Sequence, residues 1–248
     1  MNQFTRTQLL IGEAGLKKLA ESRVAVFGIG GVGGFVCEAL VRSGIGAFDL
    51  IDNDQVDLTN LNRQIIATHR TVGRAKVDLM KERMLAINPD VEVRLHRCFF
   101  LPENSDEFSF GEYDYVVDAV DTVAAKIEII MKSREAGVPV ISAMGTGNKM
   151  DPGRLQITDI HKTKVCPLAR VMRHEMKKRG VKKLKVVFSD EEPIRPAGRT
   201  VDGAGASAGG ENGAVRSRPV PGSNSFVPAT AGLMMASEVI KDLIQWPG

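Results

Sequence analysis

"FGIGGVGGFVCEALVRSGIGAFDLIDNDQVDLTNLNRQ", residues 27–64, is the stretch that decides the fold. It runs from an apolar segment into closely spaced glycines, continues as an apolar-rich segment closed by Gly44, and reaches a second apolar segment that ends in Asp52. A short apolar run before glycines predicts a buried strand, and the segment closed by Gly44 predicts a helix. The order strand, glycine loop, helix, strand is typical of a nucleotide-binding α/β sheet.

The same alternation extends on both sides of this stretch. Further strands are predicted at residues 91–96, 113–121, 138–144, 154–160 and 183–189, and further helices at 7–20, 73–87, 122–137, 166–179 and 226–246. Strands that alternate with helices at regular intervals predict a mainly parallel, doubly wound, Rossmann-like sheet with helices on both faces. A smaller C-terminal α/β extension is expected to follow this core.

The chain of 248 residues is long enough for one sizeable domain. We expect a nucleotide-binding core at about 20–147, a basic helix and crossover at about 148–225, and a closing helix at 226–246. Residues 193–222 contain seven Gly, four Pro and no aromatic residue, which predicts a mobile crossover or lid.

Composition narrows the class of protein. Hydrophobic residues make up 43% and charged residues 25% of the chain, as in soluble globular proteins. The sequence suggests neither a signal peptide nor a membrane span, so a cytoplasmic protein without a membrane partner is expected. The three cysteines, Cys37, Cys98 and Cys166, lie far apart, which argues against a disulfide framework and a CxxC zinc site.

The glycine loop predicts a phosphate site. Gly28, Gly30 and Gly33 satisfy the G-x-G-x-x-G pattern, with Gly31 inside it, between a strand and a helix. Such a loop lets phosphates approach the amide groups at the helix N-terminus. Asp52 ends the next strand, where a carboxylate can accept hydrogen bonds from ribose hydroxyls.

The sequence NLNRQ distinguishes this chain from a dehydrogenase. It places Asn60, Arg63 and Gln64 on the loop after the second strand, where a guanidinium and amides suit the oxygens of a triphosphate. Lys76 begins the next helix and can point at the same phosphates. Considered one at a time, the two residues have simpler alternatives: Arg63 could form a surface ion pair, and Lys76 could be a solvent-exposed helix lysine.

Asp118 and Asp121, in "DAVDT", end a central strand at the same edge of the sheet. A carboxylate that faces a polyphosphate implies Mg²⁺, so Asp121 is the predicted metal ligand. Asp121 could instead cap the following helix, and Asp118 could be a helix cap or an acid satisfied in the core. Arg63, Lys76, Asp121 and the glycine loop together favour ATP over a nicotinamide cofactor.

At these residues the chain resembles the ubiquitin-activating-enzyme-like superfamily, which includes the bacterial molybdopterin-synthase and thiamine-sulfur-carrier adenylyltransferases. The spacings agree, with eleven residues from Asp52 to Arg63 and thirteen from Arg63 to Lys76. The resemblance implies attack of a carboxylate on the α-phosphorus of ATP. It also implies a homodimer in which Arg6 reaches the ATP of the partner, although only one of the two arginines of the family's N-terminal segment is present.

A second resemblance concerns the acceptor. "GTGNKMDP" (145–152) and "DIHKTKVCPLAR" (159–170) closely resemble the tRNA threonylcarbamoyladenosine dehydratases. That family activates the threonine carboxylate of the modified adenosine, which then cyclises and releases AMP. The alternative is an adenylyltransferase for a ubiquitin-like sulfur carrier, but such members commonly carry two CxxC pairs that this chain lacks. A cysteine-desulfurase or sulfur-acceptor protein is a further candidate partner. Cys166 is either a sulfur-handling or acyl-accepting thiol or a packing residue.

Residues 162–185 hold ten Lys/Arg and one Glu, about +9, whereas the whole chain carries +3. Such asymmetry predicts a polyanionic partner, here tRNA. The predicted RNA-binding side chains are Arg170, Arg173 and Lys177, on one helix face. Leu168, Val171, Met172 and Met176 are expected on the apolar side. The alternative is a solvated helix face.

Overall fold

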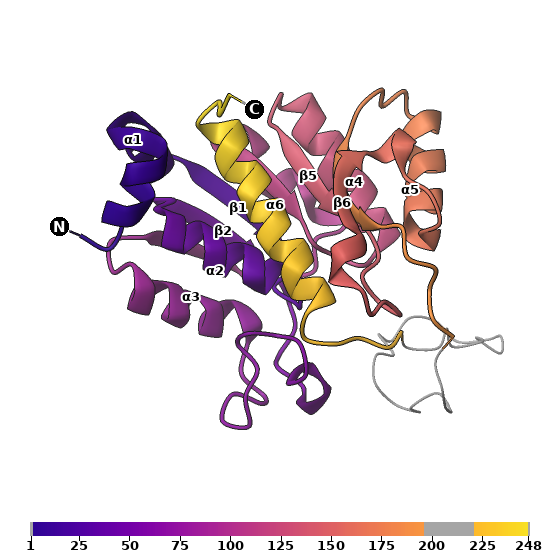
Figure 1. The fold of residues 1–248 in the computed structure, drawn as a ribbon, viewed down its shortest axis with the longest axis horizontal. Helices are drawn as coiled ribbons and strands as arrows, with labels where there is room; N and C mark the ends of the chain where they lie inside the picture. Colours follow the sequence, from indigo (N-terminus) through magenta and orange to yellow (C-terminus); the bar gives the residue numbers. More distant parts are fainter. Residues whose placement is uncertain (1, 196–220, 248) are drawn as a thin grey trace.

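The fold, taken from a computed structural model that describes residues 2–195 and 221–247, is built on one sheet (Figure 1). The seven strands lie in the order β3-β2-β1-β4-β5-β7-β6, and every neighbouring pair is parallel except β6 and β7. Their bounds are β1 Arg23–Phe27, β2 Ala47–Ile51, β3 Glu92–His96, β4 Tyr115–Asp118, β5 Val140–Ala143, β6 Leu155–Asp159 and β7 Lys185–Ser189. The predicted doubly wound α/β fold is confirmed.

Helices cover both faces of the sheet, and all the predicted ones are present. They are α1 Thr5–Ala20, α2 Gly33–Ser43, α3 Lys76–Ile87, α4 Val123–Glu135, α5 Pro167–Lys178 and α6 Val227–Leu243. Helices α2, α3 and α6 pack on one face, whereas α4 and α5 pack on the other (Figure 1). The C-terminal strands β6 and β7 extend the same sheet, because β7 pairs with β5. No described helix has both the length and the apolar character needed to cross a membrane.

Side chains of β1 alternate between the two halves of the core. Val24 and Val26 pack with α2 and α6, whereas Ala25 and Phe27 face an aromatic cluster that includes Phe100. This alternation follows from the period of two along a strand. The chain winds to β2 and β3 on one side of β1, then crosses to β4 on the other side. Adjacent β1 and β4 thus form the switch point at which α/β sheets bind ligands.

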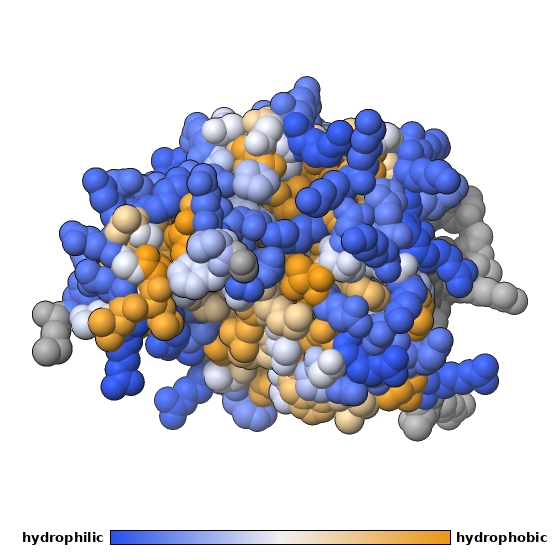
Figure 2. Space-filling model, turned by 45° about the horizontal axis from the view of Figure 1, so that its top comes forward, coloured by the Kyte–Doolittle hydropathy of each residue, from blue (hydrophilic) through white to orange (hydrophobic). Residues whose placement is uncertain are grey.

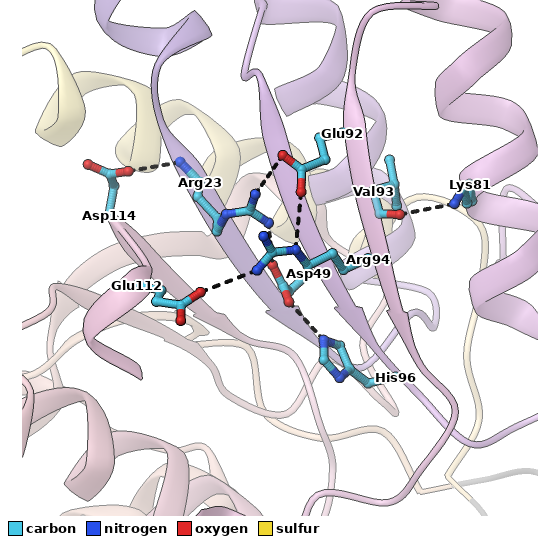
Figure 3. Close-up of polar contacts among 9 residues, drawn as sticks. All are labelled: Arg23, Asp49, Lys81, Glu92, Val93, Arg94, His96, Glu112 and Asp114. Atoms are coloured by element: carbon cyan, nitrogen blue, oxygen red, sulfur yellow. Dashed lines mark hydrogen bonds and ion pairs between the residues drawn. The ribbon is translucent and has the colours of Figure 1, made fainter. Parts of the chain in front are cut away.

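Charged side chains cover the face of β1–β3 opposite α2 and α3 (Figure 3). Asp49 is buried, with one carboxylate oxygen 2.9 Å from Arg23 Nη1 and the other 2.7 Å from His96 Nε2. Arg23 continues to Glu92 at 2.8 Å, and Glu92 to Arg94 at 3.1 Å. The network gives each of these charged side chains a partner of opposite charge on this face of the sheet.

The predicted crossover at 193–222 lies mostly outside the described residues. Its described ends are held by one residue. Asn148 accepts a backbone hydrogen bond from Ile194 (2.9 Å) and exchanges backbone and side-chain bonds with Gly222 (2.8 and 2.7 Å). These contacts bring the two ends to the loop after β5.

Candidate functional site

A cavity of about 680 Å³ opens at the carboxyl ends of β1, β2 and β4. Of the predicted nucleotide-binding residues, it is lined by Gly28, Gly30, Gly31, Asp52, Asn60, Arg63, Gln64, Lys76 and Asp121. The lining also includes Asp54, Phe99, Thr146 and Ser223, which the sequence analysis did not single out. The structure therefore brings together in one cavity polar side chains from segments that are far apart in the chain.

The glycines of the loop have different structural roles. Gly28 has φ +89°, and a Cβ there would lie 2.7 Å from the carbonyl oxygen of Ala119, so the loop passes close to the end of β4. A Cβ on Gly33 would lie 1.8 Å from the carbonyl oxygen of Gly28. At Gly30 the nearest atom would be Gln64 Nε2, at 3.9 Å. Gly28 and Gly33 thus permit the turn, whereas Gly30 leaves the space that a phosphate needs.

Asp52 fixes the shape of this loop. Its Oδ2 accepts a hydrogen bond from the amide of Ile29 at 2.6 Å, and its Oδ1 accepts one from Asp54 at 2.8 Å. Burial raises the pKa of the Asp52 carboxyl, although the nearby charge of Lys76 opposes that shift. Each oxygen keeps a second lone pair, so the carboxylate can still accept from a ribose hydroxyl.

Arg63 is half-buried at the pocket wall. Its Nη1 donates to the carbonyl oxygen of Thr59 (2.8 Å) and to Asn62 Oδ1 (2.9 Å). Among the described residues it makes no ion pair, so the alternative of a surface ion pair is wrong. Burial lowers the pKa of Arg63, with Asp57 acting in the opposite direction. In the described part of the chain, no carboxylate contacts the guanidinium to neutralise its charge.

Lys76 is 5% exposed, so it is not a solvated helix lysine. Its ammonium lies 2.6 Å from Asp54 Oδ2, inside the cavity. An antiparallel bridge between Gln55 and Ala75 sets this contact, together with a hydrogen bond from the Lys76 amide to the Asp54 carbonyl oxygen at 3.0 Å. The lysine is thereby aimed into the cavity rather than along the helix.

The two side-chain amides of the predicted site, Asn60 and Gln64, differ in their hydrogen bonding. Asn60 Oδ1 accepts from the backbone of Asp57 at 3.1 Å and completes a capping box, so this oxygen shapes the loop. Gln64 Oε1 is the one buried side-chain polar atom of the described residues without a hydrogen-bond partner. A buried amide oxygen is rarely left unpaired. Its place in the wall of this cavity fits a site built for a polar ligand.

Asp118 and Asp121 lie in different environments. Asp118 is fully buried, accepts from Lys126 Nζ at 3.0 Å and from Ser142 Oγ, and is therefore the core-satisfied acid. Asp121 is exposed in the cavity and makes no ion pair with any described residue. The residue that caps α4 is Thr122, without a side-chain bond, so Asp121 is not the cap. Its carboxylate remains available to a ligand.

The described residues include no group of three or more His, Cys, Asp or Glu side chains that could hold a metal. A single carboxylate at a polyphosphate pocket still fits Mg²⁺, because this ion is commonly held by one or two carboxylates together with substrate phosphates. The donor set at Asp121 is of that kind.

Arg6 does not join this cavity within one chain. It is exposed on α1, at the opposite side of the molecule from α5 (Figure 1). Cys166 does not line the cavity either; it is 2% exposed and packs with Met172 and Met176 in the α4–α5 core. Its environment is that of a packing residue.

The basic helix α5 corrects one prediction and adds a contact to another. Nη1 of Arg173 donates at 2.6 Å to both the carbonyl oxygen and Oγ1 of Thr163, so Arg173 anchors the helix, and its predicted contact with RNA stays a prediction. Val171 was expected on the apolar side, yet it is 45% exposed. Arg170 and Lys177 are exposed, as predicted. The Thr163 contact could not be read from helical periodicity, because Thr163 precedes the helix.

Two further residues of the site had a weak signal in the sequence. Asp54 follows Asp52 by two positions, and Asn62 lies inside the NLNRQ motif. Neither spacing says which side chain meets Lys76 or Arg63. These partners become evident only from the contacts in the fold.

The ThiF family model matches residues 4–248 of this chain. The tRNA threonylcarbamoyladenosine dehydratase of Bacillus subtilis is 44% identical over 247 residues, which cover 99% of this chain and 96% of that protein. The Escherichia coli protein of the same name is 38% identical over 98% of this chain and 93% of its own length. The crystal structure of the E. coli dehydratase in complex with ATP has a TM-score of 0.85 and 35% identity, and the match covers 98% of this chain and 94% of that one.

Proposed function

The chain belongs to the ThiF family, and from this premise we propose that it is an ATP-dependent dehydratase of threonylcarbamoyladenosine in tRNA. The observation that carries the proposal is the match to the dehydratases over nearly the full length of both chains. The cavity independently supports the use of ATP, since its glycine loop and cations suit a nucleoside triphosphate.

The reaction requires alignment more than acid–base chemistry. The threonine carboxylate of the modified adenosine forms a bond to the α-phosphorus of ATP, and the bond from that phosphorus to pyrophosphate breaks. A group of the same modified nucleotide then attacks the acyl carbon and loses its proton, and AMP leaves with one carboxylate oxygen. The net result is loss of water from the substrate, with no nucleophile required from the protein.

The residues that line the cavity have different proposed roles in this reaction. Arg63 and Lys76 lie where they neutralise charge that grows on the phosphates as pyrophosphate leaves. Asp52 positions the ribose, and the amides of Gly30 and Gly31 face the phosphates. Asp121 would hold Mg²⁺, which would neutralise the triphosphate.

The tRNA is proposed to bind on the α5 side of the molecule. Six basic side chains there are exposed and make no ion pair with a described residue: Lys162, Arg170, Lys177, Lys178, Lys182 and Lys183. Unpaired cations on one side of a molecule suit contacts with a phosphate backbone. Arg173 would support this surface by anchoring α5.

We further propose a homodimer through α1 and α6. Leu9 and Leu10 are 83% and 76% exposed, and Leu10 lines an apolar groove of about 430 Å³ together with Leu233 and Trp246. Figure 2 shows apolar side chains gathered between hydrophilic ones over the face turned to the viewer. Arg6, on the same helix as Leu9, would reach the ATP of the partner. Mixing Arg6→Ala with Asp121→Ala protein should then restore part of the activity that each lacks.

The deciding experiment is mass spectrometry of tRNA nucleosides after incubation of threonylcarbamoyladenosine-containing tRNA with the protein and ATP. Loss of one water per modified adenosine, with AMP and pyrophosphate in equal amounts, is the expected result. Unchanged nucleosides together with an adenylated ubiquitin-like carrier would favour the adenylyltransferase alternative.

We also propose that the reaction takes place in the cytoplasm. A sulfur-transfer partner stays a prediction; Cys98 is the partly exposed cysteine it would meet.

A further inference from the structure

Residues 221–226, which lead into α6, are held at three points. Gly222 bonds to Asn148, as described above, and Asn224 Nδ2 donates to the carbonyl oxygen of Lys149 at 2.7 Å. Both contacts attach the segment to the loop after β5. The third contact attaches it to the nucleotide cavity, since Asn62 Nδ2 donates to the carbonyl oxygen of Ser223 at 3.0 Å.

The same Asn62 side chain holds Arg63. Its Oδ1 accepts from Arg63 Nη1 at 2.9 Å, so the two ends of one amide bind Arg63 and Ser223. The other acceptor of Nη1, the carbonyl oxygen of Thr59, is also neutral. A guanidinium has five donors, and Nε and Nη2 of Arg63 have no partner in the part of the chain that the structure describes. The geometry fixes the guanidinium while leaving its charge and most of its donors for an anion.

Packing places the beginning of α6 beside Arg63 as well. A Cβ on Gly31 would lie 3.4 Å from both Arg63 Cγ and Pro228 Cβ. Arg63, Pro228 and Ser223 all line the cavity. Gly31 of the glycine loop therefore lies against both the stem of Arg63 and the N-terminal end of α6.

We propose that Asn62 is a positioning residue that couples the aim of Arg63 to the docking of residues 221–226. Bound ATP and the docked segment then stabilise each other, because linkage between two sites is reciprocal. The inference rests on the proposed function only in taking ATP as the ligand of this cavity.

A double-mutant cycle tests whether Asn62 acts through Arg63. ATP affinity is measured by calorimetry, without tRNA, for the intact protein and for Asn62→Ala, Arg63→Ala and the double variant. Asn62→Ala should weaken ATP binding roughly tenfold, as for loss of a hydrogen bond to a charged group. In the Arg63→Ala background the same change should have less than about a twofold effect. Equal effects in both backgrounds would overturn the inference.

The variant Asn62→Asp keeps the shape of the side chain but adds a negative charge beside Arg63. It keeps an acceptor for Arg63, but it cannot donate to Ser223 and it neutralises the guanidinium. ATP binding should be weaker than in Asn62→Ala, and ATP binding at the level of the intact protein would contradict the proposal.

Hydrogen exchange of residues 221–226 provides the second readout. Exchange should accelerate most in both Asn62 variants and less in Arg63→Ala, which leaves the Ser223 bond intact but removes the side chain that orients Asn62. Unaltered exchange in the Asn62 variants would also overturn the inference. Asn88→Ala, at the far end of α3, is the control for loss of an asparagine contact away from the cavity. If the intact protein binds no ATP, the proposed function itself fails.

Discussion

The ammonium group of Lys76 lies 2.6 Å from the carboxylate of Asp54, and both side chains line the nucleotide cavity. Lys76 is 6% exposed at its side chain, whereas Asp54 is 50% exposed. Asp54 therefore occupies, for the lysine, the position that a phosphate oxygen would take. A triphosphate must share Lys76 with this carboxylate or displace it.

Asp54→Asn should bind ATP more tightly, because it removes an anion from a pocket that receives four negative charges. We expect a dissociation constant about three- to tenfold lower. The rate of AMP formation should fall, because the released lysine is no longer held in one position. Calorimetry and pyrophosphate release measure the two effects. Glu82→Gln, which removes an ion pair to Arg74 outside the cavity lining, is the control, and weaker ATP binding by Asp54→Asn would contradict the prediction.

Asp121→Asn should lose AMP and pyrophosphate formation by about 100-fold or more, because the variant lacks the carboxylate proposed to hold Mg²⁺. Its melting temperature should stay within about 2 °C of the parent, since the side chain is exposed and makes no ion pair with a described residue. Turnover at several Mg²⁺ concentrations checks the first expectation and calorimetric unfolding the second. Near-normal turnover would remove Asp121 from the site.

Lys126→Met should destabilise the fold by about 3–5 kcal/mol, because it leaves the Asp118 carboxylate buried without its cation. The double variant Lys126→Met/Asp118→Asn should recover part of this loss, since no charge remains buried. Urea unfolding at pH 7 measures both. If the double variant is less stable than the single one by the full cost of Asp118→Asn, the two groups do not interact as the structure indicates.

Asp49 should make stability depend on pH in the acid range. Burial by itself would raise the pKa of this carboxyl, but hydrogen bonds from His96 and Arg23 outweigh it and hold the pKa below its usual value. A lowered folded pKa contributes stability that is fully present above the unfolded value, about 3.9, and is lost as pH falls through the folded value. Asp49→Asn should be about 2 kcal/mol less stable at neutral pH, with a smaller difference at pH 2–3. An equal difference at both pH values, by urea unfolding, would contradict this.

Charge reversal on α5 should separate the exposed cations from the anchoring one. Arg170→Glu/Lys177→Glu should weaken tRNA binding and reduce the logarithmic salt slope by about two units, one for each phosphate contact. ATP affinity should be unchanged, because neither residue lines the cavity. Arg173→Ala should instead lower the melting temperature, since it loses both bonds to Thr163.

Filter binding at several salt concentrations measures the slope. Lys17→Glu, on exposed α1 at the opposite side of the molecule, is the matched control. An unaltered slope in the double reversal would move the RNA site away from α5.

The sequence by itself determined the doubly wound sheet and the place of the cavity. Apolar periods, Gly44 and the glycine loop are local signals, and parallel strands necessarily bring their carboxyl ends to one edge. Gly28, Gly30, Asp52, Arg63 and Lys76 could therefore be assigned to one pocket from their positions after the predicted strands and at the start of a predicted helix. The residue types also favoured a triphosphate, because charge and hydrogen-bonding capacity belong to the side chain wherever it lies.

Only the tertiary structure decided what each of these side chains touches. Asp118 and Asp121 are three positions apart, yet one is fully buried against Lys126 and the other is exposed in the cavity, because the chain leaves β4 between them. Asn62 meets Ser223 across 161 positions, a contact that no local pattern encodes. Burial and hydrogen-bond partners arise from segments distant in sequence. They separate the buried acid Asp118 from Asp121, the proposed metal ligand, and the anchoring Arg173 from Arg170, which is exposed.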